Sequence, residues 1–132
     1  MTKPTIFPAL HFTDAEAGMA FLTALGFTRT ALYRNESDPT QIDHAEFGWG
    51  AAGGVMCGSA SRSDGPFARP VGTGDMYLVV PTDAEVDAVH ARAIAAGGTS
   101  LQEPAGVEYG GRTAGFRDPE GNQFSVGSYP GE

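Results

Sequence analysis

The sequence predicts an α+β protein, in which two βαβββ modules form a curved eight-stranded mixed sheet with a concave ligand cavity. Two observations lead to this prediction. The tetrapeptide Thr-Asp-Ala-Glu occurs at 13–16 and again at 82–85, and each copy stands between a short apolar run and an amphipathic helical pattern. Each helical pattern is followed by three strand-like segments that turn residues separate. The same order of elements, found twice, indicates an internal duplication.

Both tetrapeptides have the spacing of a capping box, in which Thr and Glu three residues apart bond the first free amides of a helix. We therefore expect helices to begin at Thr13 and Thr82. Glycines that follow the two apolar stripes, Gly26 and Gly97, mark where the helices end. Apolar side chains recur at helical spacing in both segments, so each helix has one face to bury.

The chain of 132 residues suffices for one domain, 1–132. We divide it into module one (1–59), a linker rich in Ser, Gly and Pro (60–74) and module two (75–132). One helix per module covers one face of a four-stranded sheet, so the other face stays open or is closed by a ligand or the sister module. The predicted strands are 6–12, 28–34, 42–49 and 55–59, then 76–80, 99–103, 112–117 and 122–128.

Composition excludes several classes of partner. Sixteen acidic and eight basic residues give a net charge of −8, which repels phosphates, so we expect no nucleic-acid partner. The same charge would favour a cationic ligand. No segment approaches the roughly 20 apolar residues of a membrane span, and the first residues do not resemble a secretory signal, so we expect a cytoplasmic protein without a membrane partner. A single cysteine, Cys57, excludes an intramolecular disulfide framework.

Four segments resemble the vicinal oxygen chelate superfamily, and within it the small bacterial glyoxalase/bleomycin-resistance subgroup. They are LGF (25–27), HAEFGWG (44–50), YGGR (109–112) and FRDPEGNQFSVGSY (116–129). The superfamily includes glyoxalase I, extradiol dioxygenases, fosfomycin-modifying enzymes and bleomycin resistance proteins. The resemblance extends over about residues 5–129 and implies the paired-module fold and a homodimer. Function differs among members that share the fold.

In the superfamily's enzymes, inward positions on the first and last strand of each module hold a divalent metal. By the resemblance these positions are Phe7, Cys57 (with one residue of uncertainty), Met76 and Ser125. Such metals need carboxylate or imidazole ligands, and one thiol does not suffice. We therefore expect no metal and no cofactor at this site.

We interpret the protein as a non-metal binding protein, and not an enzyme, that sequesters a hydrophobic or aromatic compound as the bleomycin resistance proteins do. Strand parity from Phe7, Met76 and Ser125 would turn Ala9, His11, Leu78, Val80, Gln123 and Gly127 toward the cavity. The predicted ligand-binding residues are Phe7, His11, Glu46, Phe47, Trp49, Cys57, Met76, Gln123 and Ser125.

Other interpretations remain at this stage. A glyoxalase-like lyase or isomerase could use a displaced metal, or a metal-free acid/base pair built on His11 or on His44 and Glu46. The pocket could also be vestigial, in a domain that mainly dimerises. Alternation leaves two choices for one strand, since either Phe47 and Trp49 or His44 and Glu46 face the cavity. The Cys57 thiol is either buried and inert or a nucleophile.

Overall fold

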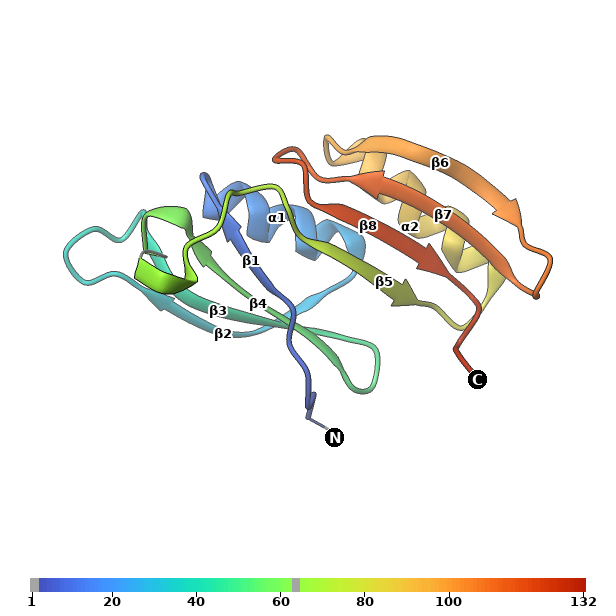
Figure 1. The fold of residues 1–132 in the computed structure, drawn as a ribbon, viewed down its shortest axis with the longest axis horizontal. Helices are drawn as coiled ribbons and strands as arrows, with labels where there is room; N and C mark the ends of the chain where they lie inside the picture. Colours follow the sequence, from blue (N-terminus) through green and yellow to red (C-terminus); the bar gives the residue numbers. More distant parts are fainter. Residues whose placement is uncertain (1–2, 63–64) are drawn as a thin grey trace.

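The chain folds into two βαβββ modules (Figure 1), as seen in a computed structural model that describes residues 3–62 and 65–132. The predicted α+β class and the duplication are confirmed. Module one consists of β1 (Ala9–Phe12), α1 (Ala15–Leu25), β2 (Thr28–Arg34), β3 (Ile42–Trp49) and β4 (Gly53–Ser59). Module two consists of β5 (Asp75–Val79), α2 (Asp83–Ala95), β6 (Thr99–Gly106), β7 (Arg112–Arg117) and β8 (Gln123–Gly127).

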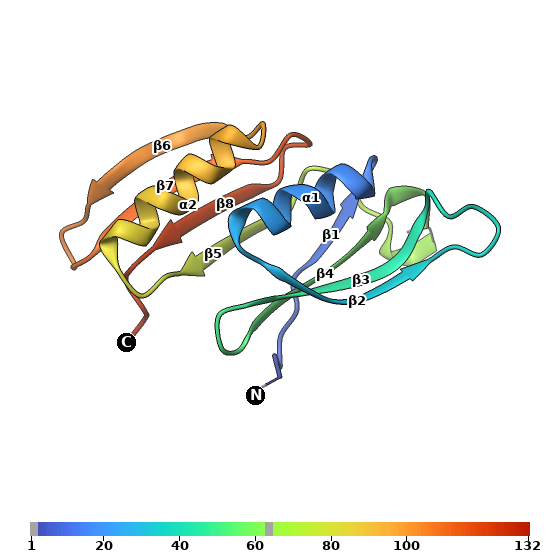
Figure 2. The same cartoon turned by 180° about the vertical axis from the view of Figure 1, so that it is seen from behind.

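The eight strands of the described residues form two four-stranded sheets, with the orders β1-β4-β3-β2 and β5-β8-β7-β6. We call them sheet one and sheet two. In each sheet the first strand pairs in parallel with the last, and the other pairs are antiparallel. The sheets lie side by side, and within residues 3–62 and 65–132 no strand of one pairs with a strand of the other, so they do not form the single sheet expected from the sequence. Both helices lie on the same side of them, so one face of each sheet has no helix over it (Figures 1 and 2).

Helix α1 packs against both modules. Its apolar face lies on sheet one, where Leu22 and Leu25 have no exposed surface. Its Phe21 reaches into module two, where the ring lies 6.2 Å from Phe116 and 6.1 Å from Phe124 between centroids. The hydrophobic core is therefore continuous across the two modules.

Module two also bonds the polar ends of α1. The Glu120 carboxylate accepts hydrogen bonds from the backbone N–H groups of Thr13 (2.7 Å) and Asp14 (2.8 Å) at the start of the helix. At the other end, the Arg92 guanidinium donates to the carbonyl oxygen of Leu25 (2.8 Å). Free amides and carbonyls at helix ends need such partners. The negative and positive groups also match the signs of the helix dipole.

The helix caps differ between the modules. Thr82 caps α2 as predicted, since its side chain accepts a hydrogen bond from the N–H of Glu85 (3.3 Å). The predicted cap at Thr13 is wrong: Asp14, one residue later, caps α1. The two capping residues are therefore 68 positions apart, one fewer than the spacing of the tetrapeptides.

A buried turn holds Glu120 in place. Asp118 and Asn122 are 4% and 2% exposed, and Asp118 Oδ1 accepts hydrogen bonds from the N–H groups of Glu120 and Asn122, each at 2.9 Å. Asn122 Oδ1 in turn accepts from the N–H of Gly74 at the end of the linker. A Cβ at Gly72, which has a φ of +77°, would lie 2.2 Å from the Glu120 carbonyl oxygen. The close approach of linker and turn therefore requires glycine at this position.

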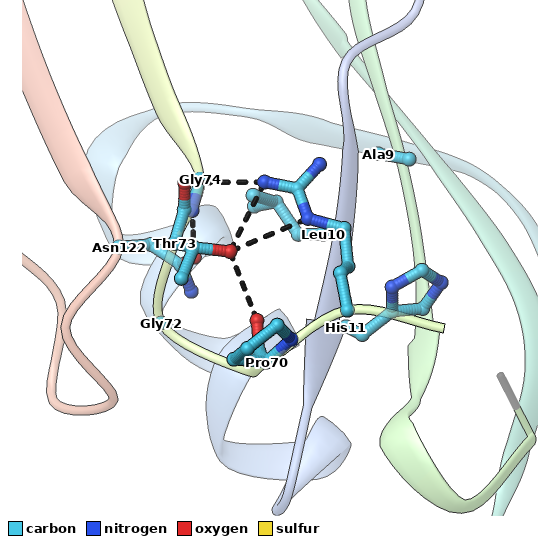
Figure 3. A pocket seen from close by; sticks show the side chains of 9 residues that line it. Ala9, Leu10, His11, Pro70, Gly72, Thr73, Gly74 and Asn122 are labelled. Carbon is cyan, nitrogen blue, oxygen red and sulfur yellow. Dashed lines mark hydrogen bonds between the residues drawn. The ribbon is translucent and has the colours of Figure 1, made fainter. Parts of the chain in front are cut away.

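The end of the linker lies beside β1 (Figure 3). The Thr73 hydroxyl donates to the Pro70 carbonyl (2.9 Å) and accepts from the Arg69 guanidinium. His11 is on the neighbouring strand, and its ring points away from Thr73 (Figure 3). The guanidinium of Arg69 is therefore hydrogen-bonded within the linker itself.

Neither helix of the described chain is long and apolar enough to cross a membrane.

We expect the substitution Glu120→Ala to destabilise the protein, because two N–H groups at the start of α1 lose a charged acceptor. The loss should be about 1–2 kcal/mol, which for a domain of this size lowers the melting temperature by roughly 3–8 °C. Thermal unfolding followed by circular dichroism measures this change. The control is Glu108→Ala, which removes an exposed carboxylate between β6 and β7; equal melting temperatures for the two variants would contradict the role given to Glu120.

Candidate functional site

The helix-free face of sheet one carries the polar and small side chains of that sheet. Side chains alternate between the two faces of a strand, and directly paired residues share a face. Leu10 and Phe12 are buried beneath α1, so the residues that alternate with them lie on the other face. Through the strand pairings, this open face of sheet one consists of Ala9, His11, Thr28, Ala31, Tyr33, His44, Glu46, Gly48, Gly54, Met56 and Gly58.

The surface of the open face, which we call its floor, carries small side chains beside the larger Met56 and Glu46, which pair with each other. Gly48 pairs with Gly54, and Ala9 pairs with Met56. The Phe7 ring lies over Gly54, where an added Cβ would come within 2.7 Å of it. Phe7 and Pro4 therefore already cover Gly54, and the part of the floor left for a ligand lies around Ala9, Met56 and Glu46.

A hollow of about 190 Å³ lies at the other end of this face, and its lining includes His11, His44, Met56 and Gly58. His44 Nε2 lies 2.7 Å from the Oε2 atom of Glu46, and both side chains are about one-third exposed. Such a pair can orient a ligand through hydrogen bonds, or it can move a proton. The choice that alternation left open is therefore decided: His44 and Glu46 point to the open face.

Phe47 and Cys57 lie on the opposite face, in the core beneath α1, where they are 1% and 5% exposed. Burial raises the pKa of the Cys57 thiol to about 12. The thiol is therefore neutral at ordinary pH and is a poor nucleophile, which favours the inert alternative. Both residues were predicted to bind ligand, and the structure places neither at the open face.

In module two, Gln123 and Ser125 point to the helix-free face, whereas Met76 does not. Met76 pairs with the buried Phe124, so Met76, Leu78 and Val80 face the helix side, and the predicted orientation of this strand is wrong. The error has a physical cause. The assignment of Phe7 and Met76 to equivalent positions implies a repeat of 69 residues, whereas the helix caps repeat at 68, and a shift of one residue reverses every side chain of a strand. The helix-free face of β5 instead carries Asp75, Tyr77 and Val79.

Trp49 lies at the seam between the modules. Its Nε1 donates a hydrogen bond to the carbonyl oxygen of Val79 (2.8 Å), and its ring is 4.8 Å from that of Phe27 between centroids. Trp49 also lines a seam cavity of about 350 Å³ together with Met76 and Tyr77. Two of the predicted ligand-binding residues, Trp49 and Met76, are therefore together, but away from His11 and Glu46.

The four positions that the resemblance assigns to a metal do not form a metal site. Phe7 has no donor atom, and Cys57 and Met76 are on the helix side of their sheets, whereas Ser125 is on the other side. In the part of the chain that the structure describes, no group of three or more His, Cys, Asp or Glu residues could hold a metal ion. The residues present therefore do not fit the divalent metal of the enzymes.

Sequence reasoning missed Met56, Tyr33 and the glycines of the open face. Met56 precedes Cys57, so it lies within the one-residue uncertainty of that assignment. The segment Gly53–Ser59 has glycines at 54 and 58, two residues on either side of Met56.

Comparisons with known proteins agree with this architecture. The family model described as Glyoxalase/Bleomycin resistance protein/Dioxygenase superfamily matches residues 9–126. Hypothetical protein SA1046 from S. aureus is 26% identical, with coverage of 93% of this chain and 91% of that chain and a TM-score of 0.64. TioX from Micromonospora sp. ML1 is 23% identical, with 92% and 95% coverage and a TM-score of 0.70. Lactoylglutathione lyase from Agrobacterium tumefaciens is 23% identical, with 96% and 91% coverage and a TM-score of 0.67. No curated protein matches the chain.

Proposed function

The chain belongs to the glyoxalase/bleomycin resistance protein/dioxygenase superfamily, and we propose that it binds a small hydrophobic or aromatic molecule on the open face of sheet one. The observation that carries this proposal is the floor of the open face, where Ala9, Met56 and Glu46 lie between the Phe7 ring and the His11–His44 hollow. The protein would act by stoichiometric burial of its ligand, as in resistance to a toxic natural product. A cytoplasmic location is part of the proposal, since Cys57 is a free thiol.

Each part of the face has a role in this mechanism. Phe7 and Met56 supply apolar contact to a ring on the floor, and burial of one ring is worth about 1–3 kcal/mol. His11 and Glu46 supply hydrogen bonds that orient the ligand. The divalent metal of the family's enzymes has no part, because the residues at its positions do not fit it.

Sheet one cannot enclose such a ligand alone. Its hollow of about 190 Å³ is smaller than the roughly 300–1,000 Å³ of typical ligand pockets. A second wall is needed, and we propose that a second copy of the chain supplies it. The helix-free face of sheet two carries the exposed Tyr77 and Val79, and an apolar face of this kind favours association. Gln123 and Ser125 would then meet the ligand from that wall.

The first expected result is therefore a homodimer. Multi-angle light scattering at concentrations of tens of micromolar, well above a ~1 μM dissociation constant, should give twice the mass of one chain. A mass equal to one chain at that concentration would contradict the proposed second wall.

A rival function is supported by one contact. The 2.7 Å contact between His44 and Glu46 is the geometry of an acid/base pair, in which the carboxylate orients the imidazole for proton transfer. A metal-free lyase or isomerase could use it. A turnover that requires His44 would distinguish this enzyme from a binding protein.

The binding proposal is tested by filling the floor. Ala9→Leu places a larger side chain on the open face, away from the core, and should weaken binding of planar hydrophobic natural products by tenfold or more, that is by about 1.4 kcal/mol. Equilibrium dialysis of a compound panel, followed by mass spectrometry, measures affinity and shows whether the compounds are recovered unchanged. The control is Ala88→Leu at an exposed position of α2.

Two results would contradict the binding proposal. If Ala9→Leu and Ala88→Leu bind the compounds with equal affinity, the ligand lies elsewhere. Conversion of a compound by the parent protein, abolished by His44→Gln, would establish the rival enzyme instead.

A further inference from the structure

The charged residues of module one are divided between the two faces of its sheet. Arg34 on β2 forms an ion pair with Glu16 of α1, so its guanidinium is on the helix side. Arg29 on the same strand pairs with the buried Phe47, which faces the helix side. The pKa of the Glu16 carboxyl is lowered, chiefly by the hydrogen bond from Arg34 and to a smaller extent by the charge of Arg29. Both cations of β2 therefore lie on the helix side.

The open face of sheet one has the opposite character. Its eleven residues, as defined above, include Glu46, two histidines and no lysine or arginine. The nearest part of the linker does hold a cation, Arg69, but its guanidinium donates to Thr73. The chain as a whole carries a net charge of −8. A ligand that approaches this face therefore meets a negative potential.

Glu46 has capacity for a further hydrogen bond. Its Oε2 atom contacts His44, and no hydrogen bond to Oε1 occurs within residues 3–62 and 65–132. Glu46 also pairs directly with Met56 and Ala31 across the sheet, so its carboxylate lies on the floor of the open face. Beyond it, the Tyr33 ring lies 6.1 Å from that of His44 and offers an aromatic face to a cation.

A ligand that covers this floor displaces water from the Glu46 carboxylate. If the ligand brings no positive charge or hydrogen-bond donor, the carboxylate loses hydration without compensation, which is costly. A cation on the ligand compensates that cost, and an anion increases it. Charge complementarity at this one side chain can therefore set which planar molecules bind.

We propose that the ligand of this site is a planar aromatic cation, whose rings lie on the floor of the open face and whose protonated nitrogen is bound by Glu46. This inference rests on the proposed function, because it concerns the same face. It adds the chemical class of the ligand and the side chain that selects it.

Three tricyclic probes of nearly equal size test the selection: 9-aminoacridine, which is protonated at about pH 8, neutral acridine and the anion anthracene-9-carboxylate. Titrations followed by probe fluorescence should show that 9-aminoacridine binds at least tenfold more tightly than acridine, with the anion weakest. Equal affinities for the three probes would overturn the inference and leave the proposed binding function standing. No binding of any probe would overturn both.

A matched pair of variants locates the selection. Glu46→Gln keeps the size of the side chain and should reduce the preference for 9-aminoacridine over acridine to less than about threefold, with little change in acridine affinity. Glu36→Gln removes the same charge from the exposed loop between β2 and β3 and should keep the tenfold preference. Equal loss of preference in both variants would show that the net charge of the chain, and not Glu46, makes the selection, and would overturn the assignment.

Discussion

The arrangement of the whole molecule depends on how α1 is held between the modules. One face of the helix packs on sheet one. In module two, the Phe116 and Phe124 rings pack against the helix, and the Glu120 carboxylate and the Arg92 guanidinium form hydrogen bonds with its ends. A helix fixed in this way cannot turn relative to module two, so both helices stay on one side of the two sheets. The opposite faces are then left free for a ligand or a second chain, which is the arrangement on which the proposed function relies.

The elements could be predicted from the sequence, because their patterns are local. Apolar spacing, the cap at Thr82 and the turn around Asp118 each depend on residues close together in the chain, and each was found where expected. The cap at Thr13 was mispredicted because its N–H is bonded by Glu120, which is 107 residues away. No local pattern contains that contact.

The site could be predicted only in part, because the direction of a side chain depends on register. His11, Gln123 and Ser125 point to helix-free faces as their strand parity predicted, and the direction of Glu46 had been left open. Met76 faces the helix side, and its direction was mispredicted because the modules repeat at 68 residues and not at 69. The position of Trp49 at the seam depends on a tertiary contact, because its hydrogen-bond partner Val79 belongs to the other module.

The measurement that tests the account most directly is the set of backbone amide chemical shifts of the labelled protein with and without a bound planar ligand. The account predicts that the shifts change along β1, β3 and β4, at residues such as His11, Glu46 and Met56, and that the amides of α2 stay unchanged. Changes confined to the seam around Trp49 and Phe27, with β1 and β3 unaffected, would contradict it. The ligand would then occupy the seam cavity, and the open face of sheet one would have another purpose.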